Sequence, residues 1–520
     1  MVSVLDLEEG TAFVGGAGKD YATPEHLLLK YANRHGLIAG ATGTGKTVTL
    51  QTLAETLSLA GVPVFLSDIK GDLSGLSTAG TAQSKLHDAF EKRASQIGCT
   101  LDYQSFPVTF WDVWGEFGHP VRTTPAEMGP LLLSRLLDLT PAQEGVMNIA
   151  FHVADEDGLP LLDLKDLQTM LIWVGQNASD LSLRYGNVSA ASVGAIQRAL
   201  LVLENEGGDR LFGEPALELS DLMRQDASGK GVINILAAER LMNAPKLYAT
   251  FLLWLLSELF EQLPEVGDPE VPRIAFFFDE AHLLFDDAPK ALIDKVERVA
   301  RLIRSKGVSV WFVSQNPTDI PDSVLGQLGN RVQHALRSFT AKDQKALRLA
   351  AENYRPNPEF DIADAIQQVG TGEAVTSFLM EKGMPGIAQR TLIRPPFSQL
   401  GPIDVRMRAD ILAASDQGAK YNTPLDRESA QEMLAKRTAD AAAAAKGADL
   451  ADDDLFDMSP DDGYRNARRY EAPAPAKKPA RSSRSDSVLE TFGKSLARQL
   501  GTRTGQALVR GVLGSLLKRR

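Results

Sequence analysis

A short glycine-rich segment followed by a lysine and a threonine has the residue types needed to hold a chain of phosphates. Residues 40–47 read Gly-Ala-Thr-Gly-Thr-Gly-Lys-Thr and lie between a brief apolar run and a stretch with helical periodicity. Glycine at positions 40, 43 and 45 lets the backbone curl so that its N–H groups converge on phosphate oxygens. The N-terminus of the following helix adds partial positive charge. In this context the pattern G-x-x-x-x-G-K-[ST] predicts a nucleoside triphosphate site.

The side chains of this segment supply further parts of a phosphate and magnesium site. The Lys46 ammonium can reach the β- and γ-phosphates, and the Thr47 hydroxyl can complete the coordination of a magnesium ion. We therefore expect ATP and Mg²⁺ as cofactors, with Lys46 contributing to catalysis and Thr47 to metal binding. The residues expected to contact the nucleotide are Gly40, Ala41, Thr42, Gly43, Thr44, Gly45, Lys46, Thr47 and Val48.

Two adjacent acidic residues follow an apolar segment that has the pattern of a buried strand. Residues 274–278 are Ile-Ala-Phe-Phe-Phe, and Asp279 and Glu280 come next. Open α/β sheets hold their ligands at the carboxyl ends of such strands. Asp279 is expected to bind the magnesium ion, and Glu280 to orient the water that attacks the γ-phosphate. An acidic strand end is common, so this assignment depends on the phosphate-binding segment upstream.

Two further polar residues near predicted strand ends have less specific roles. Gln315 ends the apolar segment 308–314, where a polar group could sense the γ-phosphate; a simple turn residue is the alternative. His282 could contact the nucleotide or form a structural hydrogen bond at the start of a helix. We include Gln315 among the catalytic candidates and leave the role of His282 open.

Three arginines recur at every third residue along the predicted helix of residues 289–306. Arg298, Arg301 and Arg304 drift around the helix surface, as expected for a solvated face. Arg304 lies at the end of this helix, where the nucleotide of a neighbouring subunit could approach. A guanidinium binds phosphate oxygens through two hydrogen bonds, so Arg304 is a candidate arginine finger and Arg331 is the alternative.

Composition excludes several classes of protein. The 520 residues carry a net charge of −12 and include one cysteine, Cys99. A single cysteine rules out an internal disulfide framework and fits a reducing cytoplasm. The nearest approach to a membrane-spanning stretch, 248–263, is too short and contains Glu258 and Glu261. We therefore expect a cytoplasmic protein that is neither secreted nor membrane-spanning. The acidic total still permits nucleic-acid binding through a local basic surface.

Strand-like and helix-like segments alternate over most of the chain, which predicts an α/β fold with a doubly wound, mainly parallel sheet. Residues 438–485 have the composition of a disordered linker. Residues 487–520 contain seven basic residues and one acidic residue, with apolar residues at helical spacing. The expected organisation is a lead-in (1–30), an ATPase core (31–121 and 226–400), a helical insertion (122–225), a C-terminal helical extension (401–437), a disordered linker (438–485) and a basic amphipathic helical tail (486–520).

These motifs, in this order, resemble the HerA-like helicases of the FtsK–HerA class of P-loop ATPases. The resemblance covers roughly residues 10–400 and rests on the phosphate-binding segment, 65–73 (FLSDIKGDL), 277–282 (FFDEAH), the arginine-bearing helix and 311–316 (WFVSQN). It implies a RecA-like P-loop NTPase fold and a hexameric ring with nucleotide at the subunit interfaces. It also implies a catalytic glutamate and an arginine from the adjacent subunit, roles that fall on Glu280 and Arg304. HerA begins with a β-barrel domain, for which residues 1–30 are too short, so the resemblance is to the bacterial HerA-type branch without that barrel.

Two functions from different classes fit these features. The first is an ATP-driven homo-oligomeric ring that translocates or unwinds DNA, with Lys70, Arg337 and Lys342 as candidates for contacting the phosphate backbone. The second is an ATP-dependent scaffold or regulator that remodels a protein or membrane-surface partner. Its basic tail could lie on an anionic membrane, in a partner's groove, or against its own ring. A nucleotide kinase is disfavoured because residues 122–225 are too many for a simple lid.

Overall fold

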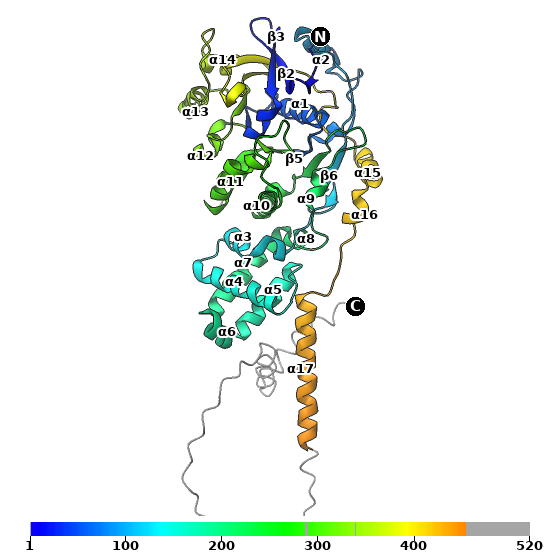
Figure 1. Cartoon of the computed structure of the whole chain (residues 1–520), viewed down its shortest axis with the longest axis vertical. Helices are drawn as coiled ribbons and strands as arrows, with labels where there is room; N and C mark the ends of the chain where they lie inside the picture. The colour runs from blue at the N-terminus through cyan, green and yellow to red at the C-terminus, as the bar shows by residue number, and fades with distance from the viewer. Residues whose placement is uncertain (1, 286–289, 339, 454–520) are drawn as a thin grey trace, which may run out of the picture.

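A computed structural model of the chain describes residues 2–285, 290–338 and 340–453. Its centre is one 13-stranded sheet with helices on both faces, and a group of helices extends from one end (Figure 1). The strand order is β1-β2-β13-β12-β11-β4-β10-β9-β5-β8-β6-β7, with β3 paired to β2. The predicted doubly wound, mainly parallel α/β fold is therefore confirmed.

The larger part of the sheet is parallel. Every neighbouring pair from β11 to β7 in this order is parallel. These strands are β11 (Asn330–Gln333), β4 (Gly36–Ala39), β10 (Val308–Ser314), β9 (Ile274–Phe278), β5 (Val64–Asp68), β8 (Ile233–Ala237), β6 (Val108–Asp112) and β7 (His119–Pro120). Because parallel strands point the same way, their carboxyl ends form one edge of the sheet.

The rest of the sheet is antiparallel and includes residues that we expected to be only a lead-in. It contains β12 (Glu373–Ser377), β13 (Gln389–Ile393), β2 (Thr11–Ala17), β3 (Thr23–Leu28) and β1 (Leu5–Asp6). A Cβ on Gly15 would lie 2.2 Å from the Leu392 carbonyl oxygen, so this residue must be glycine for the strands to pair. Since β2 pairs with β13, which is hundreds of residues away, no local pattern identified it.

Successive residues of the central strands face opposite sides of the sheet. On one side, Phe277 packs in a cluster with Leu53 of α1 (Lys46–Leu59). On the other side, Phe276 packs in a second cluster with Phe251 of α10 (Pro245–Gln262), which also includes residues of α11 (Lys290–Leu302). The remaining helices around the core are α2 (His87–Gln96), α12 (Asp322–Leu325), α13 (Ala341–Glu352) and α14 (Ile362–Gln368).

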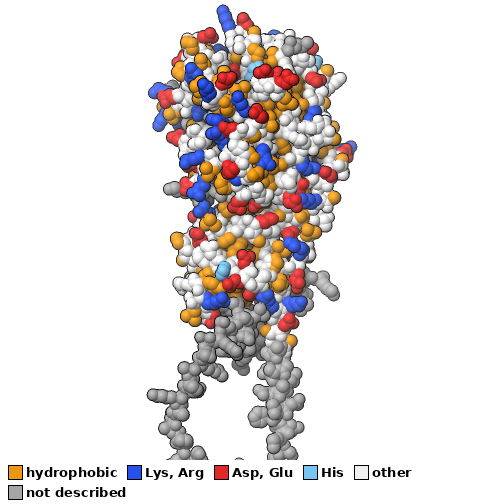
Figure 2. All heavy atoms as spheres, viewed as in Figure 1, with side chains coloured by type: hydrophobic (Ala, Val, Ile, Leu, Met, Phe, Trp, Pro, Cys, Tyr) orange, Lys and Arg blue, Asp and Glu red, His pale blue; other side chains and the backbone are white. Residues whose placement is uncertain are grey.

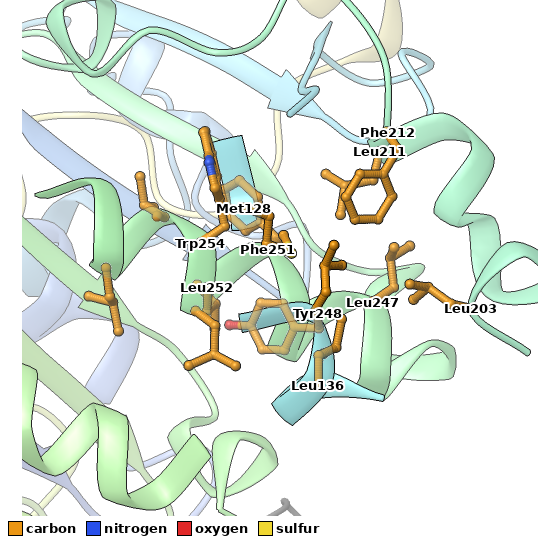
Figure 3. Packing of buried hydrophobic residues seen from close by; sticks show 14 of the residues in the cluster. Met128, Leu136, Leu203, Leu211, Phe212, Leu247, Tyr248, Phe251, Leu252 and Trp254 are labelled. Atoms are coloured by element: carbon orange, nitrogen blue, oxygen red, sulfur yellow. The ribbon is translucent and has the colours of Figure 1, made fainter. Parts of the chain in front are cut away.

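The chain between β7 and β8 forms helices, most of which lie in the group seen below the sheet in Figure 1. These helices are α3 (Pro125–Leu136), α4 (Pro141–Glu156), α5 (Leu164–Gln176), α6 (Ala178–Tyr185), α7 (Ala190–Leu203), α8 (Asp209–Leu211) and α9 (Leu219–Leu222). They belong to the same hydrophobic cluster as α10, and Figure 3 shows Met128 and Leu136 of α3 near Tyr248 and Trp254 of α10. Among the described residues no single helix is long and apolar enough to cross a membrane, although the bent pair 178–185 and 190–211 meets the length and composition required.

Three helices follow the sheet: α15 (Val405–Ala414), α16 (Gln417–Tyr421) and α17 (Ala430–Asp453). The last one contradicts the expected start of the disordered linker at residue 438. The alanine-rich stretch that we took for linker continues α17, since alanine is the strongest helix former. The helix is anchored at its start, where Ser429 donates to Asp166 of α5 at 2.6 Å. The rest of that linker and the tail 486–520 lie outside the described residues.

A buried ion pair joins α1 to the chain that leaves β13. Arg394 is 1% exposed and Glu55 is 0% exposed, and a guanidinium nitrogen donates to the Glu55 carboxylate at 3.0 Å. The other terminal nitrogen donates to the Thr52 carbonyl and the Thr56 hydroxyl at 2.7 and 2.8 Å. Glu55 also accepts from the Phe397 amide, so both charges are surrounded by hydrogen bonds.

Replacing Arg394 by methionine should strongly destabilise the protein, because Glu55 would keep a buried charge without its partner. We expect a loss of about 3–5 kcal/mol in the free energy of unfolding, measured by urea denaturation. The double variant Arg394→Met with Glu55→Gln should recover part of that loss. As a control, Arg427→Met removes a pair with Glu214 in which the arginine side chain is 64% exposed, and it should lower the midpoint far less. Equal midpoints for the Arg394 and Arg427 variants would contradict this account.

A second polar link connects the entrance of β4 to the neighbouring elements. His35 is 2% exposed, and its Nδ1 accepts from the Val310 amide at 3.0 Å. An amide can only donate, so Nδ1 is unprotonated and Nε2–H donates to the Ala300 carbonyl at 2.6 Å. Burial, together with the charge of Arg304, lowers the pKa of His35 to about 4.

Because the folded-state pKa of His35 lies below its unfolded value near 6.5, its contribution to stability is complete above pH 6.5 and is lost as the pH falls toward 4. By pH 5 the loss should be about 2 kcal/mol. His35→Asn keeps an acceptor and tolerates the positive φ of 60°. Urea denaturation from pH 7 to pH 5 should therefore show a steeper loss for the wild type than for this variant. Parallel curves would mean that another group sets the pH dependence.

Candidate functional site

The candidate residues meet at the carboxyl edge of the parallel strands. The phosphate-binding segment follows β4, Gln315 follows β10, Asp279 and Glu280 follow β9, and Lys70 lies just after β5. These strands are neighbours in the order β4-β10-β9-β5. β10, which Gln315 follows, therefore lies between the strand before the phosphate-binding segment and the strand before the acidic pair. This order brings Lys46, Gln315 and the acidic pair to neighbouring strand ends.

The phosphate-binding segment has the backbone shape that its glycines predicted. Gly40, Gly43 and Gly45 have φ values of 152°, 78° and 115°, which side chains rarely adopt. A Cβ on Gly45 would lie 3.0 Å from the Gly372 backbone nitrogen. At Gly43 a Cβ would meet nothing within 4 Å among the described residues, so the open side of the loop is free for a ligand.

Residues far along the chain hold this segment in place. The Gly372 amide donates to the Thr44 carbonyl at 2.9 Å. His334 bridges Thr49 of α1 and β12: its Nε2 lies 2.8 Å from the Thr49 hydroxyl, and its Nδ1 lies 3.0 Å from the Glu373 carbonyl oxygen. Burial lowers the pKa of His334 to about 4, so the ring is neutral at physiological pH. Sequence reasoning missed His334 and Gly372, because no local motif marks a support that comes from a neighbouring strand.

Lys46 is buried at the start of α1, with 6% of its surface exposed. Its ammonium donates to the carbonyls of Gly40 and Ala41 at 2.6 and 3.3 Å. Burial lowers the pKa of Lys46, while the carboxylates of Glu280 and Asp279 act in the opposite direction. The ammonium thus lies inside the concave side of its own loop, where phosphate oxygens would replace the carbonyls as its partners.

The Glu280 carboxylate lies close to three polar side chains. One oxygen lies 2.5 Å from the Lys70 ammonium, and the other is within 3.3 Å of both Gln315 Nε2 and His282 Nδ1. Burial would raise the pKa of Glu280, but the hydrogen bond and charge of Lys70 outweigh it and hold that pKa below its usual value. Its backbone has a φ of 45°, a conformation that non-glycine residues adopt at a cost of order 1–3 kcal/mol and mostly at functional sites.

Asp279 and the segment after β5 supply the oxygen atoms that a magnesium ion needs. Burial and the charge of Glu280 raise the pKa of Asp279 to about 6, against the effect of Lys70. Asp72 is hydrogen-bonded to the Thr47 side chain, and its Oδ1 is buried without a partner among the described residues. Thr47, Asp72 and Asp279 thus offer hydroxyl and carboxylate oxygens, which suit Mg²⁺. No group of three or more acidic, histidine or cysteine side chains in the described part of the chain could hold a metal alone, so nucleotide and water oxygens would complete the shell.

Asp68, Lys70 and Asp72 were not among the catalytic or metal candidates, and Lys70 was instead considered for DNA contact. Asp68 is fully buried and accepts from the amides of Gly71 and Leu73 at 2.8 and 3.1 Å. Burial and the charge of Asp72 raise the pKa of Asp68 to about 7. The signal that could have found them is the DIKGDL segment itself, because its charged residues follow a buried strand in the same way as Asp279 does.

Neither candidate arginine finger lies with these groups in the same subunit. Arg304 precedes β10, at the opposite edge of the sheet, and forms two hydrogen bonds with Asp268 at 3.1 and 3.0 Å. Arg331 donates to the carbonyls of Leu328, Leu325 and Asn353, which commits it to the fold. The Arg304 side chain is 41% exposed, so its role at a neighbouring subunit's site stays a prediction.

Comparison with known proteins assigns the chain to a family. The family model described as "Helicase HerA-like C-terminal" matches residues 17–520. "Probable helicase MJECL08" of Methanocaldococcus jannaschii is 29% identical over 153 residues, which cover 28% of this chain and 28% of that protein. The "DNA double-strand break repair helicase HerA" of Sulfolobus acidocaldarius is 31% identical over 98 residues, which cover 19% of each. The chain thus aligns with less than a third of the length of each of these relatives.

Two solved structures are similar at low identity. The bacterial conjugative coupling protein TrwBdeltaN70, in an unbound monoclinic form, is 15% identical with a TM-score of 0.48, covering 75% of this chain and 90% of that one. VirB4 of Thermoanaerobacter pseudethanolicus is 16% identical with a TM-score of 0.47, covering 74% of this chain and 96% of that one.

Proposed function

Because the chain belongs to the HerA-like C-terminal helicase family of P-loop ATPases, we propose that it hydrolyses ATP as a hexameric ring motor that translocates or unwinds DNA. The observation that carries the proposal is the meeting of Lys46, Glu280 and Gln315 at three adjacent strand ends. A phosphate-binding loop alone binds nucleotide, whereas a loop facing a carboxylate and a polar sensor can also direct water onto a phosphate.

The residues divide the reaction among them. ATP with Mg²⁺, when bound, supplies the γ-phosphate as the electrophile. Lys46 would neutralise the β- and γ-phosphate charge, and Thr47 and Asp279 would hold the metal. Glu280 would orient the attacking water, and its lowered pKa keeps it a carboxylate at neutral pH. Gln315, which already donates to Glu280, would contact the γ-phosphate side of that water.

The proposed hexameric ring needs a surface on which DNA can bind. The viewed face carries acidic and basic side chains interspersed rather than in one basic field (Figure 2). With a net charge of −12, DNA contact would come from local residues, for which the exposed Arg337 and Lys342 remain candidates. A cytoplasmic location agrees with the single cysteine. The alternative, an ATP-dependent scaffold that remodels a protein or membrane-surface partner, predicts no response to DNA.

Lys46→Ala and Glu280→Gln should fail in different ways. The first removes the charge that holds the triphosphate, so nucleotide binding and hydrolysis are both lost. The second keeps the shape but loses the carboxylate, so ATP binds while kcat falls by about 10²–10⁴-fold. Nucleotide titration and steady-state ATPase assays measure both. Wild-type turnover by Glu280→Gln would refute the role of Glu280.

Wild-type ATPase activity should rise when DNA is added, since a motor is driven by its track. Assays with single-stranded DNA, duplex DNA and no DNA, beside mass photometry of the same sample, test the substrate and the ring together. Lys46→Ala is the matched control for contaminating activity. If confirmed hexamers hydrolyse ATP at the same rate with single-stranded DNA, duplex DNA and no DNA, the scaffold alternative is favoured.

Arg304→Ala should abolish hydrolysis and leave nucleotide binding nearly intact, if Arg304 acts on a neighbour's site. Mixing Arg304→Ala subunits with Lys46→Ala subunits should then restore part of the activity, because some interfaces contain both intact residues. Asp268→Asn is the control, since it frees Arg304 from its own-chain partner and should preserve activity. If confirmed mixed rings stay inactive, Arg304 does not act in trans.

A further inference from the structure

Provided that the site binds ATP as proposed above, we propose that Lys70 is a positioning residue that holds Glu280 until the γ-phosphate is present and then moves to the γ-phosphate. Its ammonium lies 2.5 Å from the Glu280 carboxylate. A carboxylate in such an ion pair has that oxygen occupied and is a weaker acceptor for water. The carboxylate that should orient water is therefore restrained by a cation of its own subunit.

The surroundings of Glu280 explain why Lys70, and not Gln315 or His282, must leave before Glu280 can bind water. The second carboxylate oxygen is already near Gln315 and His282, each at 3.3 Å. A water that Glu280 is to orient needs a free lone pair on the side that faces the phosphates. The Lys70 ammonium lies on the other oxygen, so its departure opens that acceptor without disturbing the contact to Gln315.

The backbone of Lys70 is fixed while its side chain is free to swing. Asp68 accepts from the amides of Gly71 and Leu73, and its carbonyl accepts from the Ala238 amide at 2.9 Å. These bonds hold the turn on both sides of Lys70. The Lys70 side chain is 40% exposed, compared with 5% for Glu280, and a four-carbon stem allows its ammonium to exchange partners.

Repulsion between the Lys46 and Lys70 ammonium groups favours an anion, such as the γ-phosphate, between them. Burial lowers the pKa of Lys46 most, and the positive charge of Lys70 lowers it further. The two ammonium groups therefore lie close enough to repel each other. Two like charges there repel each other unless an anion lies between them. The γ-phosphate, which carries more negative charge than a carboxylate, would satisfy both lysines, and ADP would not.

The test compares ATP and ADP with Mg²⁺ by isothermal titration, using the full chain in the Glu280→Gln background so that hydrolysis does not interfere. Glu280→Gln releases Lys70 from its partner, so ATP should bind at least as tightly as to the wild type. Adding Lys70→Met should weaken ATP binding by about 10- to 100-fold, the size of a lost charge-assisted hydrogen bond. ADP binding should stay within about twofold, since Lys70 contacts only the γ-phosphate.

Three further variants make the outcome specific. Lys70→Arg keeps the positive charge and should restore most of the preference for ATP. Lys165→Met removes an exposed lysine on α5 and should change neither affinity. If Lys70→Met lowers ATP and ADP affinity equally, or lowers neither, the proposed exchange is overturned. Wild-type nucleotide binding by Lys46→Ala would instead overturn the proposed function, whatever Lys70 does.

Discussion

The structure depends on how charge is balanced at the carboxyl edge of the parallel strands. Asp68, Asp72, Asp279 and Glu280 gather there in a mostly buried region, and Lys46 provides one of the nearby positive charges. Burying like charges together is costly unless each finds a partner. Lys70 supplies the closest partner, and backbone amides satisfy Asp68. Burial, together with the neighbouring carboxylates, raises the pKa of Asp68 to about 7 and that of Asp279 to about 6, as expected where an added cation would be favourable.

The antiparallel part of the sheet has a role in the same site. Its strands do not carry phosphate-binding residues, but His334 and Gly372 lie between β11 and β12 and contact the phosphate-binding segment from behind. The chain that leaves β13 then returns to α1 through the Arg394–Glu55 pair. The helix that begins with Lys46 is therefore held at its first turn and again near its last turn by residues that follow the ATPase motifs in sequence.

What the sequence predicted well is what a short segment determines by itself. The bend of 40–47 follows from its glycines, and the apolar run before Asp279 defines a strand that the fold contains. The strands between 5 and 28 were missed because their partner β13 is remote. The contact of Lys70 with Glu280 could not be predicted, because it depends on the strand order that brings β5 beside β9. The alanine-rich start of the expected linker was misjudged because composition alone does not separate a loose chain from a helix.

The apolar run 248–263, which came nearest to a membrane-spanning stretch but was too short, is apolar for a reason that the fold makes clear. It forms most of α10, whose Phe251 packs against Phe65 of β5 in the sheet. The same helix lies beside residues of the inserted helices (Figure 3). The exposed residues of this helix are confined to its two ends, so its middle has no polar face. Natural variation at Tyr248 or Trp254 must therefore satisfy two neighbouring surfaces at once. Because α10 packs in one hydrophobic cluster with both the sheet and the inserted helices, a change of shape on either side is transmitted to the other through this helix.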